Sequence, residues 1–338
     1  MNSRRTFLKL STGLLLGTTL RPFQSFAKTI TPMRYVERAA FAMGSIVTFK
    51  AYCGDEARCN LAIDEAISEM KSVDRLMSVF DEQSQLSAVN NRAFDKELVV
   101  DTRIIEVLQS AKKYSALTGG AFDITVEPLM ELYGFRDDKS IHHFPTDKQI
   151  AITLDAVGMR NVAVDASRST VNLRYAQTKL DLGGIAVGFA IDRAITILKE
   201  HGIESALVNH SGDIYALGAP PDEEAWEVGI VDPMEPENII TSVTIRDQAL
   251  STSGNYENSI EADGGSIGHI LDPASGRTAS KILSSTVIAP TASGADALST
   301  GMFVLGIDKS RNIIRQSDAI RCIAVIRDGG RETILDLA

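Results

Sequence analysis

An aspartate and a threonine four residues apart form the most suggestive chemical pair in this sequence. A helix that begins near Ser293 would place Asp296 and Thr300 on one face, because residues four apart are neighbours on a helix surface. Their oxygen atoms suit a hard cation such as Mg²⁺, which takes its other ligands from water, backbone carbonyls or substrate phosphates. The alternative is structural, with Asp296 capping or pairing near the start of the helix.

A histidine lies upstream of this pair, beside a turn. His269 precedes Asp272-Pro273 and the sequence Ser275-Gly276-Arg277. A histidine on a structured turn can serve as a general base near neutral pH, so His269 is the candidate for proton transfer. His210 is a second candidate, although its place at a strand edge fits a structural hydrogen bond at least as well.

Two glycine pairs would let the backbone approach a ligand. Gly183-Gly184 follow Asp181-Leu182 and open a helix predicted over 184–200, whose N-terminus would suit a phosphate. The other pair opens the run TGGAFD at 118–123, which either approaches a ligand or caps the preceding helix. Neither pair follows the Rossmann or P-loop pattern, and no GxSxG supports a serine hydrolase.

The elements that would carry these residues mix helices with meander-like strands. Apolar spacing predicts helices over 56–79, 101–117 and 145–157, and a short one over 312–316. A strand-like run over 39–53 is interrupted by Met43-Gly44, and residues 80–90 form a polar loop. Strands are also expected within 206–218, 226–233 and 239–247. This mixture predicts an α+β (α/β mixed) fold without βαβ alternation.

The first residues have the features of an export signal. Arg4 and Arg5 precede Phe7, Leu8 and Lys9, and an apolar run too short to span a bilayer ends in small residues by position 27. This start resembles a twin-arginine signal, so we expect a signal peptide over 1–27, a folded domain over 28–338 and a periplasmic location. We expect no stable membrane insertion.

Composition sets further limits on the function. The chain has 338 residues and is 44% apolar, enough to bury a large core. Removal of residues 1–27 removes four basic residues and lowers the formal net charge from −10 to −14, which argues against nucleic acid as a partner. The three cysteines, Cys53, Cys59 and Cys322, show no CxxC spacing. Buried free thiols are therefore expected in preference to one disulfide bridge.

Eight motifs, taken in order, resemble the ApbE family of FAD:protein FMN transferases over about residues 40–306. They are AMGSIVTF, FDEQSQLSAVN, TGGAFDITVEPLMELYGF, LDLGGIAVGFAIDRA, ALVNHSGDIYALG, ALSTSGNYE, HILDPASGR and APTASGADALSTGMFVLG. The resemblance implies a T-fold-like architecture with FAD bound between two halves. It also implies Mg²⁺-dependent cleavage of FAD and attachment of FMN, through a phosphoester, to a threonine or serine of a partner protein with an FMN-binding domain.

The resemblance also assigns roles to individual residues. The Mg²⁺ ligands would be the side chains of Asp296 and Thr300 with the Gly184 carbonyl, and His269 would be the catalytic residue. FAD would contact Met43, Phe80, Ala121, Phe122, Asp123, Asp181, Val187 and Ile270.

Two positions depart from the family pattern. Many members carry lysine where Val187 stands and tyrosine where Phe80 stands. Loss of a lysine near an anionic nucleotide removes favourable charge, whereas phenylalanine keeps the stacking surface of tyrosine.

Three functions are therefore weighed. The first is an exported flavin transferase, similar to the NosX proteins, that matures an exported or membrane-bound electron-transfer protein. The second is an FAD pyrophosphatase that releases FMN and AMP, and the third is a periplasmic FAD-binding or carrier protein. The sequence names neither the acceptor nor the oligomeric state.

Overall fold

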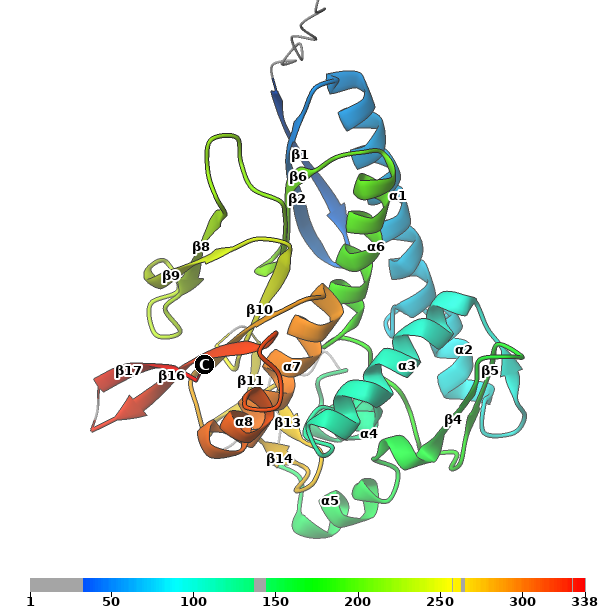
Figure 1. Cartoon of the computed structure of the whole chain (residues 1–338). Coiled ribbons are helices and arrows are strands. Elements are labelled where there is room, and N and C mark those ends of the chain that lie inside the picture. Colours follow the sequence, from blue (N-terminus) through cyan, green and yellow to red (C-terminus); the bar gives the residue numbers. More distant parts are fainter. Residues whose placement is uncertain (1–32, 137–143, 257, 263–264, 330, 338) are drawn as a thin grey trace, which may run out of the picture. The chain divides into compact units, whose positions relative to one another are not determined.

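An eight-stranded antiparallel sheet forms the centre of the structure (Figure 1). The computed structural model describes residues 33–338 except 137–143, 257, 263–264, 330 and 338, so the predicted signal peptide over 1–27 lies outside the described residues. The strands, in their order across the sheet, are β1 (Arg34–Ala42), β2 (Ser45–Cys53), β6 (Ser205–His210), β7 (Asp213–Leu217), β10 (Gln248–Gly254), β15 (Ser284–Ala289), β16 (Arg321–Asp328) and β17 (Arg331–Asp336).

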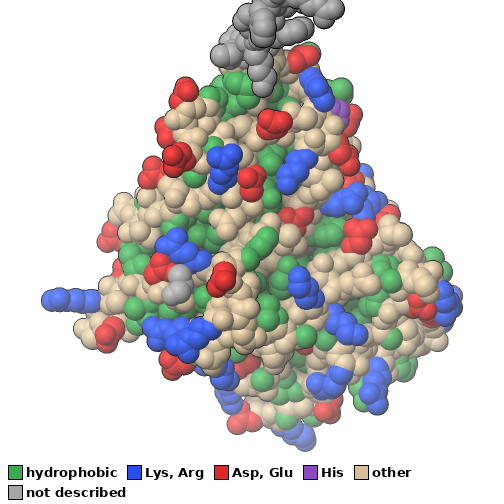
Figure 2. Space-filling model, in the orientation of Figure 1, with side chains coloured by type: hydrophobic (Ala, Val, Ile, Leu, Met, Phe, Trp, Pro, Cys, Tyr) green, Lys and Arg blue, Asp and Glu red, His purple; other side chains and the backbone are tan. Residues whose placement is uncertain are grey.

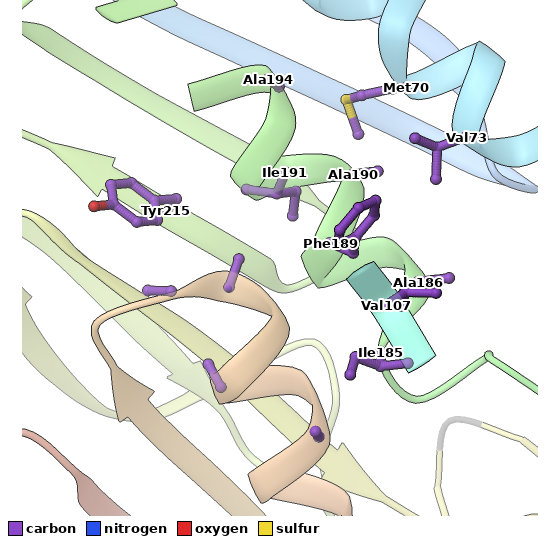
Figure 3. Packing of buried hydrophobic residues seen from close by; sticks show 14 of the residues in the cluster. Met70, Val73, Val107, Ile185, Ala186, Phe189, Ala190, Ile191, Ala194 and Tyr215 are labelled. Carbon is purple, nitrogen blue, oxygen red and sulfur yellow. The ribbon is translucent and has the colours of Figure 1, made fainter. Parts of the chain in front are cut away.

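Helices cover one face of this sheet. Helices α1 (Glu56–Met77), α6 (Ala186–Glu200) and α7 (Ala292–Leu305) pack on its strands, and α3 (Thr102–Leu117) packs on α7 and α1. The apolar sides of these helices share one core with alternate strand residues. Helix α6 lies at the centre of this layer, where it packs on α1, α7 and β7. Figure 3 shows Phe189 and Ile191 of α6 among neighbours that include Met70 of α1 and Tyr215 of β7.

The opposite face of the sheet carries a separate hairpin. Strands β8 (Trp226–Val231) and β9 (Ile239–Ile245) place Trp226, Val228 and Ile230 against Ile214 and Ile288 of the sheet. Successive strand residues point to opposite faces, so β7 and β15 contribute to both cores. Both faces are therefore buried in the middle of the sheet.

Smaller elements complete the chain. Three short strands form one sheet in the order β3 (Leu98–Val99), β5 (Thr170–Leu173) and β4 (Val162–Asp165), and two further hairpins pair β11 (Ser259–Ala262) with β12 (Gly265–Gly268) and β13 (Leu271–Asp272) with β14 (Arg277–Thr278). The remaining α-helices are α2 (Gln85–Arg92), α4 (Glu127–Tyr133), α5 (Asp147–Leu154) and α8 (Ile307–Ile314), and two 3₁₀ turns cover Ile124–Val126 and Met159–Asn161. The α+β prediction is confirmed. Within the described part of the chain, no helix is both long and apolar enough to span a bilayer.

Three sequence-based expectations were wrong in detail. Met43-Gly44 does not interrupt one strand, because both residues have positive φ and form the tight turn of the β1–β2 hairpin. The segment 80–90 is not all loop, because Ser84 caps helix α2, which buries Leu86. The short helix expected over 312–316 is α8, which begins earlier.

The cysteines behave as buried residues of the core. Cys53, Cys59 and Cys322 are all free thiols with little or no exposure. Burial raises the pKa of the Cys59 thiol to about 12 and that of Cys322 to about 11. Both thiols are therefore protonated near neutral pH and are poor nucleophiles.

Candidate active site

A cavity of about 310 Å³ brings together most of the predicted site residues. Its walls come from the turn after α3, the segment before α6, the β6–β7 turn, β10, the segment around His269 and α7. The predicted residues that line it are Phe80, Ala121, Phe122, Asp123, Asp181, Gly184, His269, Ile270, Asp296 and Thr300.

Helix α7 carries the predicted metal ligands on the side that faces the cavity. The Thr291 side chain caps the helix by accepting a hydrogen bond from the Gly294 N–H, so α7 begins at Ala292, one residue before the predicted start. Asp296 is only 6% exposed, and its Oδ2 accepts from the Gly188 N–H at 3.2 Å. The N-cap is therefore Thr291, and Asp296 is held instead by the neighbouring helix.

Helices α6 and α7 cross closely enough to bond to each other's first turn. Asp192 of α6 accepts from the N–H groups of Ala292 and Ser293 at 2.7 and 3.0 Å, while Asp296 accepts from Gly188. A Cβ added at Gly188 would lie 2.3 Å from the Ala292 carbonyl oxygen. The glycine is required because only a residue without a side chain permits this approach.

The glycine pair before α6 forms a turn next to the metal ligands. Helix α6 begins at Ala186 and not at Gly184 as predicted, because residues 183–185 form a turn in which Asp181 Oδ1 accepts from the Gly183 N–H at 2.8 Å. A Cβ added at Gly184 would lie 3.3 Å from both Thr300 Oγ1 and Phe122 Cε2. The Gly184 backbone thus lies against the threonine that was predicted to share a cation with it.

His269 is half-buried in the cavity wall. Its Nδ1 lies 2.9 Å from the carbonyl oxygen of Asn258, which can only accept, so Nδ1 carries the proton and Nε2 is the acceptor nitrogen. Burial lowers the pKa of His269, and the Asn258 carbonyl opposes this shift only in part. The imidazole is therefore neutral at pH 7, as a general base must be.

The turn after α3 both ends a helix and lines the cavity. Gly119 and Gly120 have positive φ, and the Gly120 N–H donates to the Ser115 carbonyl, so the helix-cap interpretation of this pair is correct. Asp123 follows, with Oδ1 accepting from Thr125 and Oδ2 from the Met159 N–H. Desolvation raises the pKa of Asp123, and these hydrogen bonds counteract it. Its carboxylate therefore anchors the turn.

Sequence reasoning missed Arg136, which holds two carboxylates at the cavity. Its guanidinium lies 2.6 Å from Glu127 Oε2 and 2.7 Å from Asp181 Oδ2, and its Cζ lies 5.0 Å from the centre of the Phe80 ring. Burial raises the pKa of Glu127 to about 7 despite this arginine. No local pattern marks Arg136, because Glu127 and Asp181 lie nine and 45 residues away in the sequence.

Phe80 leaves much of its ring in solvent. It is 78% exposed at the cavity edge, although Arg136 lies over the ring. Its surroundings therefore leave aromatic surface open for stacking with a planar ligand.

Sequence reasoning also missed a polar part of the cavity wall. Asp213, Ser251 and Ser253 line the cavity from β7 and β10, and burial raises the pKa of Asp213 to about 6. A hydrogen bond from Ser251 and the nearby His210 both oppose that shift. In the sequence NHSGD at 209–213, His210 is the candidate that sequence reasoning names, whereas Asp213 lines the cavity.

His210 is engaged in the fold. It is buried, and its Nε2 lies 2.9 Å from the Ala42 carbonyl oxygen, which ties the β6–β7 turn to the β1–β2 turn. Of the two interpretations of His210, the structural hydrogen bond is therefore the one that the fold shows.

Two predicted FAD contacts are not among the residues that line the cavity. The Met43 N–H donates to Asp74 Oδ2 at 2.9 Å, and the side chain packs against the main core. Val187 is half-buried in the first turn of α6 and packs against the same core.

The donor set at α7 fits a hard cation. Asp296 supplies a carboxylate, Thr300 a hydroxyl and Gly184 a backbone carbonyl, so all the ligands on offer are oxygen atoms, as Mg²⁺ prefers. Among the residues that the structure describes, no group of three or more histidine, cysteine, aspartate and glutamate side chains could hold a metal.

Charges are mixed on the face of the molecule that Figure 2 shows. Acidic and basic side chains are interspersed there. In a chain with a formal net charge of −10, an anionic ligand needs compensating charge or hydrogen-bond donors at its own site.

Comparisons with known proteins agree on one family. A model of the ApbE family matches residues 43–324. The FAD:protein FMN transferase of Klebsiella pneumoniae (strain 342) is 30% identical over 279 residues, which cover 81% of this chain and 79% of that protein. The FAD:protein FMN transferase of Treponema pallidum is 30% identical over 313 residues, covering 88% of this chain and 86% of its own length.

Solved structures show the same fold. The crystal structure of the ApbE protein from Thermotoga maritima matches with a TM-score of 0.81 and 30% identity, covering 90% of this chain and 97% of that one. The apo form of the Pseudomonas stutzeri flavinyl transferase ApbE matches with a TM-score of 0.80 and 28% identity, covering 91% and 96%.

Proposed function

Since this chain belongs to the ApbE family and is an FAD:protein FMN transferase, we propose that it uses Mg²⁺ to cleave FAD and attaches FMN to a threonine or serine of an acceptor protein. The observation that carries this proposal is the convergence of His269, Asp296, Thr300 and the Gly184 backbone on one cavity. A base and a set of hard oxygen ligands at one site are what phosphoryl transfer to a hydroxyl requires.

The metal ligands would be the carboxylate of Asp296, the hydroxyl of Thr300 and the carbonyl of Gly184. Mg²⁺ held there would neutralise charge on the pyrophosphate of FAD. The chain fixes these ligands in advance, because the Gly188 N–H holds Asp296 and the Gly184 backbone lies against Thr300.

His269 would take the proton of the acceptor hydroxyl at Nε2. The hydroxyl oxygen attacks the phosphorus of the FMN moiety, the bridging P–O bond breaks, and AMP leaves. Neutral His269 is available because Asn258 holds the proton on Nδ1 and burial keeps the pKa low. The exposed ring of Phe80 offers a stacking surface for one of the planar ring systems of FAD.

The test is a transfer reaction with the mature chain, residues 28–338. The protein is incubated with FAD, Mg²⁺ and an FMN-binding acceptor domain that carries the target threonine, and flavin fluorescence is followed on a denaturing gel. A matched acceptor with that threonine replaced by alanine is the control. Labelling of the first acceptor alone supports the proposal, whereas free FMN without labelling indicates an FAD pyrophosphatase and retained FAD indicates a carrier.

We also propose that the chain is exported to the periplasm by the twin-arginine pathway and acts there, as a NosX-like member would, on an exported or membrane-bound electron-transfer protein. The support is the sequence of the first residues, with Arg4 and Arg5 before Phe7. Replacement of both arginines by lysine should leave the protein in the cytoplasmic fraction. Unchanged export of that variant would contradict the pathway.

A further inference from the structure

Buried hydroxyl groups connect the Thr300 side chain to the backbone of its own helix. Thr300 Oγ1 lies 3.1 Å from Ser253 Oγ on β10, and Ser253 Oγ lies 2.8 Å from Ser299 Oγ. The Ser299 hydroxyl in turn donates to the Asp296 carbonyl at 2.8 Å. Ser299 is 0% exposed and Ser253 is 8% exposed, so the links between them lie in the protein interior.

The direction of this chain of hydrogen bonds is fixed at its end. A carbonyl can only accept and a hydroxyl has one proton, so Ser299 uses its proton on the Asp296 carbonyl. Ser299 must then accept from Ser253, and Ser253 must accept from Thr300. The Thr300 proton is therefore directed into the protein.

A neighbouring serine does not change this direction. Ser251 Oγ lies 3.3 Å from Ser299 Oγ, but Ser299 has no second proton to give. Ser251 is therefore the donor in that contact, or it donates to the carboxylate of Asp213. In both cases the proton of Ser299 stays on the Asp296 carbonyl.

We propose that Ser299 and Ser253 are positioning residues that make Thr300 present oxygen lone pairs, and not its proton, to a cation shared with Asp296. The inference rests on the metal site of the proposed function and names what orients one of its ligands. This series of hydrogen bonds begins at the Thr300 hydroxyl and ends on the backbone carbonyl of Asp296, so it links the two proposed ligands to each other.

Ser299→Ala tests this inference without touching the cavity, because Ser299 is not among the lining residues. In the variant, Ser253 loses its acceptor and can donate to Thr300, which occupies a lone pair that the cation needs. Ser285→Ala is the matched control. Ser285 is also 0% exposed and pairs with Ser253 across the strands. Its hydroxyl contacts Cys322 Sγ, which is not part of the hydrogen-bond series that leads to Thr300.

Mn²⁺ titration of the mature protein, followed by electron paramagnetic resonance without FAD, measures the site independently of turnover. We expect Ser299→Ala to weaken Mn²⁺ binding by about 3- to 10-fold, the usual effect of one buried hydrogen bond, and Ser285→Ala to leave it unchanged. The double variant Ser253→Ala/Ser299→Ala should bind no more weakly than the weaker single variant, because both act through one chain.

Wild-type affinity in Ser299→Ala would overturn the inference, as would losses that multiply in the double variant. If the wild-type protein bound no Mn²⁺, the metal part of the proposed function would fail and this inference with it. If Mn²⁺ binding followed the expected pattern but no flavin were transferred, the positioning role would stand and the proposed reaction would fail.

Discussion

Gly188→Ala should lower the rate of flavin transfer far more than it lowers stability, because this glycine sets the distance between α6 and α7. The new Cβ would lie 2.3 Å from the Ala292 carbonyl oxygen, whereas ordinary contacts begin at 3.4 Å. The nearest atoms, in Ala292 and Ser293, all belong to the backbone, so no side chain can rotate away. One helix must therefore move by about 1 Å relative to the other.

The expected cost to stability is small. Overpacking of a core typically costs about 1–3 kcal/mol, and alanine in place of glycine within a helix returns about 1 kcal/mol. The net destabilisation is therefore about 0–2 kcal/mol. Catalysis should suffer more, because the shift moves Asp296 relative to Gly184, and a misplacement of this size can cost about 100-fold in rate.

The assay compares thermal unfolding, Mn²⁺ affinity and the rate of flavin transfer in Gly188→Ala and in a control on the same helix. Thr196→Ala is a suitable control, because Thr196 is exposed and bonds only within α6. We expect the control to resemble the wild type in all three measurements. A Gly188→Ala protein with wild-type metal affinity and transfer rate would refute the close crossing of the helices.

Three further variants probe the site. Burial lowers the pKa of His269 below 6.5, so kcat/KM should fall only as the pH drops through that lowered value. His269→Ala should lose most of the activity and this acidic decline with it. A decline of kcat/KM that begins above pH 6.5 would contradict the assignment. Asp296→Asn should lower Mg²⁺-dependent transfer at least about 100-fold with unchanged circular dichroism, and full activity without added metal would exclude its role as a ligand. Val187→Lys should change the Kd for FAD less than about 3-fold by fluorescence titration, since Val187 packs on the core; binding about 10-fold tighter would place the residue at the nucleotide.

The sequence predicted those parts of the site that depend on local spacing. Asp296 and Thr300 share a face of α7 because they are four positions apart, and Gly183-Gly184 precede α6 because glycines favour such turns. The long amphipathic helices were predicted within a few residues for the same reason. The resemblance to a family then identified which of these local patterns belong to one site.

The parts that the sequence could not provide depend on contacts between distant segments. Arg136 reaches Asp181 from a different wall of the cavity, and Ser253 of β10 reaches Thr300 of α7. The sequence around Gly188 does not indicate that the absence of a side chain lets α7 pack closely against α6. The turn at Met43-Gly44 is hard to identify from the sequence, because two paired strands joined by a tight turn resemble one interrupted strand.

The pairing of β2 with β6 has a consequence for how the chain is synthesised. Tyr52 lies opposite Ser205, so residues 54–204 are translated between two strands that are neighbours in the sheet. Until β6 leaves the ribosome, the inner edge of β2 has no partner, and pairings of this kind slow folding and expose edges that promote aggregation. Folding before secretion, which a twin-arginine route would allow, would let this late step finish among cytoplasmic chaperones.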